Sequence, residues 1–163
     1  MQVRVAEIQD AKAITSVINA AFRLAESFLI DRDRIDAETV QSLLGKGTFL
    51  VAFGQGDEEG NDRGALAGCV YVELRGERAY LGLLSVDPKC QKAGLGSLLM
   101  NAAEKHCAEA GCRFMDLRIV NVRRELPSFY RHRGYVETGT APFTPGLNPK
   151  VPCHFVEMSK PLT

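Results

Sequence analysis

Hydrophobic residues recur in this sequence at two different spacings, and the order in which those spacings follow one another restricts the fold more than any other feature. Residues 48–54, 65–75 and 79–86 are short apolar runs, which are typical of strands. Residues 11–30 and 96–111 carry apolar residues three and four positions apart, which is typical of amphipathic helices. Along the whole chain the spacings predict a strand at 2–8, helices at 11–30 and 36–47, strands at 48–54, 65–75 and 79–86, a helix at 96–111, a strand at 113–120, a helix at 125–134, and strands at 135–139 and 151–162. This order predicts a mixed α/β fold.

Two of the predicted helices have a clear apolar face. In helix 11–30 this face consists of Ile14, Val17, Ile18, Ala21, Ala25, Phe28 and Leu29. In the helix that Gly111 ends, the face consists of Leu95, Leu98, Leu99, Ala102, His106 and Ala110. We expect both faces to pack on a sheet.

The composition is that of an ordinary globular protein, with 45% hydrophobic and 25% charged residues. A length of 163 residues fits a single domain over residues 1–163. The 20 basic residues balance the 20 acidic ones, which argues against nucleic acid or an anionic membrane surface as a partner. The first residues lack an apolar segment of signal-peptide length, and no apolar run reaches the roughly 20 residues of a membrane helix. We therefore expect a cytoplasmic protein.

The cysteines do not form a recognisable metal or disulfide pattern. There are 5 of them, and the sequence has neither a Cys-x-x-Cys pair nor the spacing of a zinc site. We expect reduced and mostly buried thiols and no metal. Cys90 is the candidate for a reactive thiol because it lies beside two glycines in a loop.

Those glycines, Gly94 and Gly96, lie in "DPKCQKAGLGSLL" (87–99), where a helix has to begin. The first N–H groups of a helix have no partner within it, and the helix dipole makes them an anion site that glycines leave accessible. The segment therefore predicts a phosphate or pyrophosphate site with Lys92 at its rim. It lacks the lysine of a P-loop, and Leu99 stands where a dinucleotide fingerprint has its third glycine. A glycine-rich helix start without any ligand is the alternative.

The neighbouring residues resemble a known family. "LLSVDPKCQKAGLGSLL" (83–99) strongly resembles the acetyl-CoA-binding motif of the GNAT (GCN5-related N-acetyltransferase) superfamily. That motif, Gln/Arg-x-x-Gly-x-Gly/Ala after Val-x-Pro, is matched by residues 91–96 after residues 86–88. "RIVNVRRELPSFYRHRGYVETG" (118–139) resembles the family's fifth strand, asparagine, short helix with a tyrosine, and following strand. The predicted order of elements agrees with the family over nearly the whole chain.

The resemblance implies a central, mostly antiparallel sheet of six to seven strands, with splayed fourth and fifth strands and about four helices. It also implies an enzyme that transfers an acetyl group from acetyl-CoA to a primary amine by direct attack in a ternary complex. The implied cofactor-binding residues comprise backbone groups along the pantetheine arm, amides around the pyrophosphate, and two side chains near the arm and the sulfur. They are Leu84, Ser85 and Val86; Gln91, Lys92, Ala93, Gly94, Leu95, Gly96 and Ser97; and Asn121 and Tyr130.

The catalytic groups follow less directly from the resemblance. Tyr130 is the candidate acid for the leaving thiolate, with a half-buried structural aromatic as the alternative. The predicted fourth strand has no carboxylate, although many family members carry a glutamate there. Glu73 on the adjacent strand is the candidate base; Glu26, His154 and a water chain are alternatives.

The acceptor site is expected between the first two helices and the late loops. The candidate acceptor-binding residues are Glu26, Phe28, Ile30, Tyr71 and His154. Acidic groups there suit a cationic amine, whereas Arg34 or Lys150 suits an acceptor that bears a carboxylate. The acceptor is a small-molecule or peptide amine of undetermined identity, and the last strand could support a homodimer. A catalytically weak domain that binds or senses acyl-CoA is the alternative function, since the strand carboxylate is missing.

Overall fold

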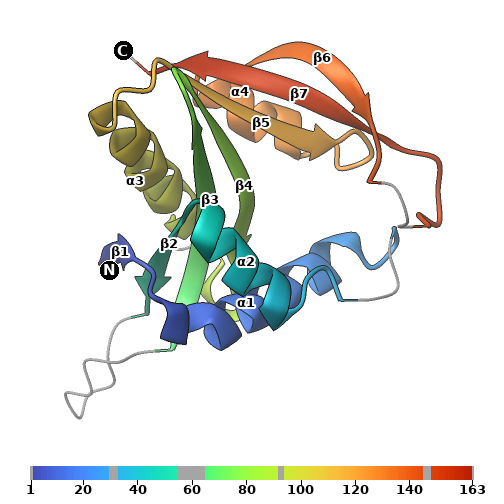
Figure 1. Cartoon of the computed structure of the whole chain (residues 1–163). Coiled ribbons are helices and arrows are strands. Elements are labelled where there is room, and N and C mark those ends of the chain that lie inside the picture. The colour runs from blue at the N-terminus through green and yellow to red at the C-terminus, as the bar shows by residue number, and fades with distance from the viewer. Residues whose placement is uncertain (1, 30–32, 55–64, 92–93, 145–147, 163) are drawn as a thin grey trace.

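The computed structural model describes residues 2–29, 33–54, 65–91, 94–144 and 148–162. Within these ranges the chain forms one seven-stranded sheet and four α-helices, which confirms the predicted mixed α/β fold (Figure 1). The helices are α1 (Ala11–Glu26), α2 (Ala37–Lys46), α3 (Leu95–Glu109) and α4 (Leu126–His132). The strands are β1 (Val3–Val5), β2 (Thr48–Phe53), β3 (Leu66–Arg75), β4 (Arg78–Val86), β5 (Phe114–Val120), β6 (Val136–Pro142) and β7 (His154–Pro161).

Two predicted elements at the N-terminus are too long. The strand predicted at 2–8 ends at Val5, because Ile8–Asp10 form a short 3₁₀ helix whose start is closed by Glu7. The helix predicted at 11–30 ends at Glu26, and the N–H of Leu29 turns back to donate to the carbonyl of Glu26 at 2.9 Å. The chain after α1 therefore leaves the helix axis.

The sheet has the order β1-β2-β3-β4-β5-β7-β6. Every neighbouring pair is antiparallel except β4 and β5, which are parallel. This parallel pair is short: it joins residues 78–80 to residues 114–116 and then stops. Beyond it the two strands diverge, as Figure 1 shows, so the predicted splay of the fourth and fifth strands is confirmed.

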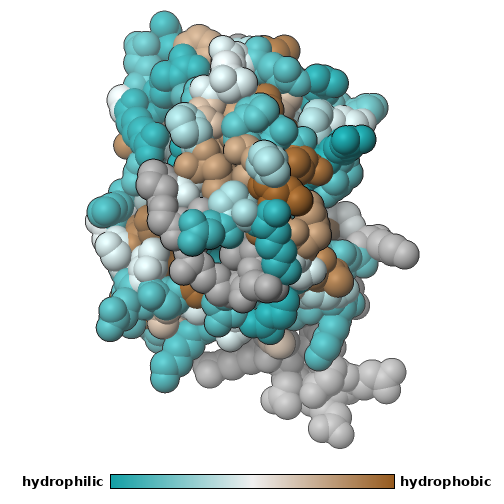
Figure 2. Space-filling view, turned by 90° about the vertical axis from the view of Figure 1, so that its right-hand side faces the viewer, coloured by the Kyte–Doolittle hydropathy of each residue, from teal (hydrophilic) through white to brown (hydrophobic). Residues whose placement is uncertain are grey.

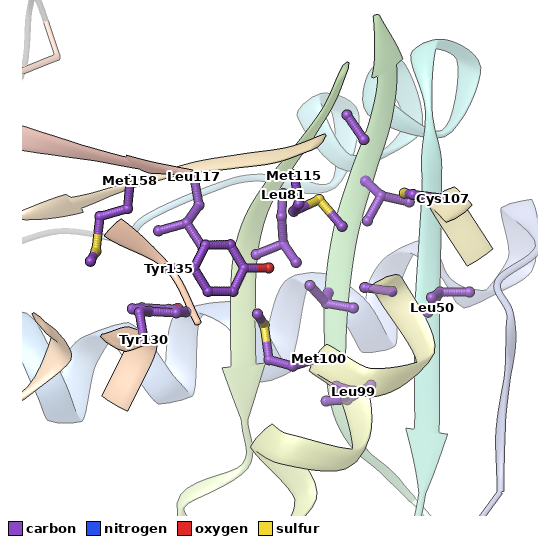
Figure 3. Close-up of a cluster of buried hydrophobic side chains, with 14 of the residues drawn as sticks. Leu50, Leu81, Leu99, Met100, Cys107, Met115, Leu117, Tyr130, Tyr135 and Met158 are labelled. Carbon is purple, nitrogen blue, oxygen red and sulfur yellow. The ribbon is translucent and has the colours of Figure 1, made fainter. Parts of the chain in front are cut away.

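Helices cover both faces of the sheet. Helices α1 and α2 pack on one face of β2 and β3, against residues such as Phe49, Val51 and Cys69. Helices α3 and α4 pack on the other face, where the core extends from Leu50 across to Met158 (Figure 3). Residues 66–72 of β3 are buried throughout, because the strand has a helical layer on each side.

The buried face of α3 differs from the predicted one. The buried residues are Leu95, Leu99, Met100, Ala103 and Cys107. Leu98, Ala102 and His106 are only half-buried and Ala110 is exposed. The buried face of α3 is rotated relative to the predicted one because α3 packs on β3 and β4 and also borders the buried residues around Tyr135. Met100 is buried in this cluster (Figure 3).

Strand β4 carries a bulge beyond the residues that pair with β5. Between the Tyr71–Gly82 and Cys69–Ser85 pairs, two residues of β4 lie opposite one residue of β3. Leu83 in this bulge has a φ of 55°, which is uncommon for a residue other than glycine. The hydroxyl of Ser85, a buried side chain, donates to the carbonyl of Leu83 at 3.0 Å and supports the bulge.

Candidate active site

The splay between β4 and β5 opens into a cavity of about 550 Å³. Residues from both strands line it, together with α1, the start of α3, α4 and the segments around residues 123 and 143. Figure 2 faces the side of the molecule where α1 and β5 end, and apolar side chains lie in the middle of that face with polar ones around them. Of the predicted site residues, those lining the cavity are Glu26, Leu84, Ser85, Val86, Gln91, Gly94, Leu95, Gly96, Ser97 and Tyr130.

The N-terminus of α3 borders this cavity without a side-chain cap. Gly94 is the N-cap residue, with a left-handed φ of 74°, and as a glycine it offers the first turn no capping side chain. A Cβ atom at Gly94 would meet nothing within 4 Å, and one at Gly96 would meet only Cζ of Phe129 at 4.0 Å. The first amides of the helix are therefore accessible to an anion. Lys92 and Ala93 lie outside the described residues.

The loop before α3 is held to the sheet. The carboxylate of Asp87 accepts from the N–H of Lys89 at 2.9 Å, and the N–H of Asp87 donates to the carbonyl of Ala67 at 2.8 Å. Pro88 begins the short 3₁₀ helix that these bonds enclose. Cys90 ends that helix and lines the cavity with a half-buried side chain.

Tyr130 on α4 lies in the wall of the cavity and is only 6% exposed. Its ring makes edge contacts with Phe129 and Tyr135, with centroids 5.0 and 5.8 Å away. Its hydroxyl has no hydrogen-bond partner in the described part of the chain. Burial raises the pKa of Tyr130 to about 12, so the phenol keeps its proton at neutral pH. Tyr130 can therefore donate to an atom placed in the cavity.

A cluster of charges lies at the α1 end of the cavity. The guanidinium of Arg123 contacts the carboxylate of Glu26 at 3.1 Å and that of Glu125 at 2.8 Å. The side chains of Glu26 and Arg123 are 9% and 18% exposed, whereas that of Glu125 is 63% exposed. All three residues line the cavity. The cluster ties the end of α1 to the segment between β5 and α4.

Two predicted residues, Tyr71 and Glu73, lie on β3 and do not line this cavity. The hydroxyl of Tyr71 donates to the carboxylate of Glu73 at 2.9 Å, and Nε of Arg75 donates to the same carboxylate at 2.6 Å. The bond from Arg75 and the bond from Tyr71 lower the pKa of Glu73. Tyr71 is buried and lines a neighbouring cavity of about 630 Å³.

The other predicted residues lie near the end of β5 and of α1. The side-chain oxygen of Asn121 accepts from the N–H of His154 at 2.8 Å and so fixes the start of β7. Neither Asn121 nor His154 lines the cavity. Phe28 follows α1, is 48% exposed and also lies outside the cavity lining. Ile30 lies outside the described residues. For these residues the assigned roles stay predictions.

Comparison with known proteins gives the family. Residues 14–135 match the model of the family described as "Acetyltransferase (GNAT) family". The chain belongs to the GNAT acetyltransferase family. The resemblance of the two motifs is thereby confirmed. Comparison of the sequence with curated proteins found no significant match.

Solved structures share the GNAT fold at low sequence identity. The ribosomal-protein-S18-alanine N-acetyltransferase from Escherichia coli has a TM-score of 0.75 and 16% identity, covering 99% of this chain and 94% of that one. An aminoglycoside 6'-N-acetyltransferase complexed with coenzyme A has a TM-score of 0.74 and 18% identity, and the match covers 100% of this chain and 98% of that one. The putative acetyltransferase yncA from Salmonella typhimurium, with its cofactor acetyl-CoA, has a TM-score of 0.74 and 19% identity, and the match covers 100% of this chain and 94% of that one.

Sequence reasoning missed part of the lining in this GNAT protein. It did not single out Arg118, Arg123 and Glu125, nor the aromatic residues Phe22 and Tyr80, all of which line the cavity. Arg123 and its partner Glu26 are 97 residues apart, so no local pattern links them. In the described ranges, no helix is long and apolar enough to cross a membrane, and no three His, Cys, Asp or Glu side chains are grouped to hold a metal ion.

Proposed function

We propose that this GNAT protein is an N-acetyltransferase that acetylates a primary amine with acetyl-CoA by direct attack in a ternary complex. The observation that carries the proposal is the cavity between the splayed strands, which has the uncapped start of α3 on one side and Tyr130 in its wall.

The residues of the cavity fit the parts of acetyl-CoA. From Leu81 onward, β4 has no described strand partner on its β5 side, so backbone groups of residues 84–86 would be available to the amides of the pantetheine arm. The amides at the start of α3, together with Gln91, would hold the pyrophosphate. The apolar wall of Leu117, Ile119 and Phe129 would cover the arm.

When bound, acetyl-CoA supplies an acetyl thioester, whose acyl group passes to the acceptor nitrogen as the C–N bond forms and the C–S bond breaks. Two protons leave the ammonium form of the acceptor in this exchange, and one of them ends on the thiol. Tyr130 would hold a proton at its hydroxyl and donate it to the leaving sulfur, since its raised pKa keeps it protonated.

The proton of the ammonium group needs an acceptor within the cavity. Glu73 lies outside the cavity lining and its carboxylate is engaged by Arg75 and Tyr71. Glu26 is a buried carboxylate that does line the cavity. We therefore assign to Glu26 the acceptance of one ammonium proton, which would return through solvent to the Tyr130 hydroxyl after the thiol has formed, while the second ammonium proton is released to solvent.

The proposal is tested by incubating the protein with acetyl-CoA and a panel of primary amines. The panel contains amino acids, aminoglycosides, polyamines and peptides with a free N-terminus, and products are identified by chromatography and mass spectrometry. Product detection is preferable to thiol reagents because the chain has 5 cysteines of its own. We expect an N-acetylated product and free CoA with at least one amine class. Binding of acetyl-CoA without acetylation of any amine would support the binding or sensing domain instead.

A further inference from the structure

Charged groups of opposite sign line the α1 side of the cavity. Phe22 and Glu26 are four residues apart on α1, so they lie on the same face about 6 Å apart along the helix axis. The guanidinium of Arg34 lies 5.5 Å from the centre of the Phe22 ring. Arg34, Phe22 and Glu26 all line the cavity. A guanidinium and a carboxylate thus line the same end of the cavity.

The cluster of Glu26, Arg123 and Glu125 carries a net negative charge. One guanidinium, Arg123, serves two carboxylates, those of Glu26 and Glu125, so the charges of the three groups sum to −1. Glu26 is 7% exposed, so water screens its charge poorly. This end of the cavity therefore favours an ammonium group over a neutral or anionic group.

The positive charge of Arg34 is not paired within the described residues. Its neighbours Asp33 and Asp36 are both engaged: Asp33 pairs with Arg23, and Asp36 accepts from the N–H of Thr39 at 2.7 Å. No described carboxylate lies within ion-pair distance of Arg34. Its guanidinium lies against the Phe22 ring, which leaves its planar fork of N–H donors able to bind a carboxylate in a bidentate way.

Arg118 is the other cavity arginine without an ion pair in the described residues. It is opposite Glu157 in the register of β5 and β7, on the same face of the sheet, so an opposite charge lies near it. Its guanidinium also lies 4.4 Å from the centre of the Phe155 ring. Arg34 is therefore the better candidate to bind an acidic group of the acceptor.

We infer that the acceptor is a free α-amino acid with a small or medium apolar side chain, an inference that rests on the proposed function. The ammonium would lie at Glu26 and the carboxylate at Arg34, because these oppositely charged groups line the same end of the cavity and each can make charge-assisted hydrogen bonds to one end of the amino acid. Apolar residues at this end, Ala21, Ala25 and Phe143, would receive the side chain. A polyamine or aminosugar would bring a second cation toward Arg34, and a peptide N-terminus has no carboxylate there.

The test uses three matched sets of acceptors with the full chain and acetyl-CoA. Each set contains an amino acid, its amide and its decarboxylated amine: leucine, leucinamide and isoamylamine, with the corresponding sets for methionine and phenylalanine. The best amino acid should exceed its amide and its amine at least 30-fold in kcat/KM. Equal or higher kcat/KM for the amide or the amine in every set would overturn the inference.

Variants of Arg34 test whether this residue binds the carboxylate of the acceptor. Arg34→Gln should lower kcat/KM for the best amino acid at least 30-fold and change that for its decarboxylated amine less than threefold, and Arg34→Lys should restore part of the loss. Arg113→Gln is the matched control, since Arg113 is exposed and lies outside the cavity; it should change neither value. An equal loss for amino acid and amine in Arg34→Gln would show a structural role and contradict the inference.

A binding measurement separates the inference from the proposed function. Titration calorimetry of the amino acid into CoA-saturated protein should give an affinity that Arg34→Gln weakens at least 30-fold. If acetyl-CoA neither binds nor is consumed with any amine, the proposed function fails together with the inference. If amines are acetylated without preference for a carboxylate, only the inference on the acceptor fails.

Discussion

Replacing Tyr130 by phenylalanine should impair catalysis while leaving the fold and cofactor affinity intact. The hydroxyl has no partner among the described residues, so removing it should change the free energy of unfolding by less than about 1 kcal/mol. General acid catalysis typically contributes a factor of about 10² to 10⁴, so kcat should fall at least about 100-fold. At pH 8 a phenol with a pKa of about 12 is almost fully protonated, so the parent carries its proton throughout the usual assay range.

The matched control is Tyr135→Phe. Tyr135 is 1% exposed, its hydroxyl is buried with no hydrogen-bond partner among the described residues, and it does not line the cavity. Its ring centroid lies only 5.8 Å from that of Tyr130. Removing this unpaired hydroxyl should leave kcat unchanged and leave the unfolding free energy unchanged or raise it by about 1 kcal/mol.

The assay measures kcat by product formation at saturating acetyl-CoA and amine, the dissociation constant of acetyl-CoA by calorimetry, and unfolding by urea. If Tyr130 is the acid, only kcat falls, and only in Tyr130→Phe. A Tyr130→Phe variant with at least half of the parent kcat would refute the reasoning. A fall of similar size in Tyr135→Phe would refute it as well, because both losses would then reflect packing.

Three further predictions concern stability. Gly68→Ala should lower the free energy of unfolding in urea by about 1–3 kcal/mol, because its Cβ would lie 2.9 Å from Cδ1 of Leu99; Gly139→Ala, with nothing within 4 Å, should change it by less than about 0.5 kcal/mol. Arg123→Met should lower the free energy of unfolding by about 3 kcal/mol, because it leaves the Glu26 carboxylate buried without its partner. An unchanged free energy of unfolding would show that the pair does not form in solution. The melting temperature should fall as the pH rises above about 8.5. Burial raises the pKa of several thiols and phenols above their values in the unfolded chain, so the folded state holds more protons than the unfolded state at these pH values. A melting temperature that stays constant between pH 8.5 and 11 would contradict this. These groups are Cys69, Cys107, Tyr71, Tyr130 and Tyr135.

The order of helices and strands could be predicted because each element buries one face on a common sheet. The spacing of Ile14, Val17 and Ile18 is imposed by the helix repeat itself, and all three are buried as expected. The buried face of α3 was harder to predict, because helix 96–111 has apolar residues around more than half of its circumference. Packing against β3 and the cluster around Tyr135 decides which of them are buried.

The α3 end of the site could be predicted because a contiguous segment forms it. Gly94 and Gly96 are two residues apart, so one local pattern describes the whole uncapped start of α3. The proposed acceptor end depends on contacts that only the fold creates, such as that of Arg123 with Glu26. The orientation of Glu73 was equally invisible in the sequence, since it follows from hydrogen bonds with Tyr71 and Arg75.

The central claim is that the start of α3 binds the pyrophosphate of acetyl-CoA, and calorimetric titration with acetyl-CoA tests it most directly. The three proteins to compare are the parent, Gly96→Gln and Gly96→Glu. The two variants add side chains of equal size at a position where a Cβ meets only one atom, at 4.0 Å, and they differ in charge. We predict micromolar binding by the parent, binding within about tenfold of it by Gly96→Gln, and binding weakened about 100-fold or more by Gly96→Glu, because its carboxylate repels the pyrophosphate. No binding by the parent, or equal affinities of the two variants, would contradict the claim.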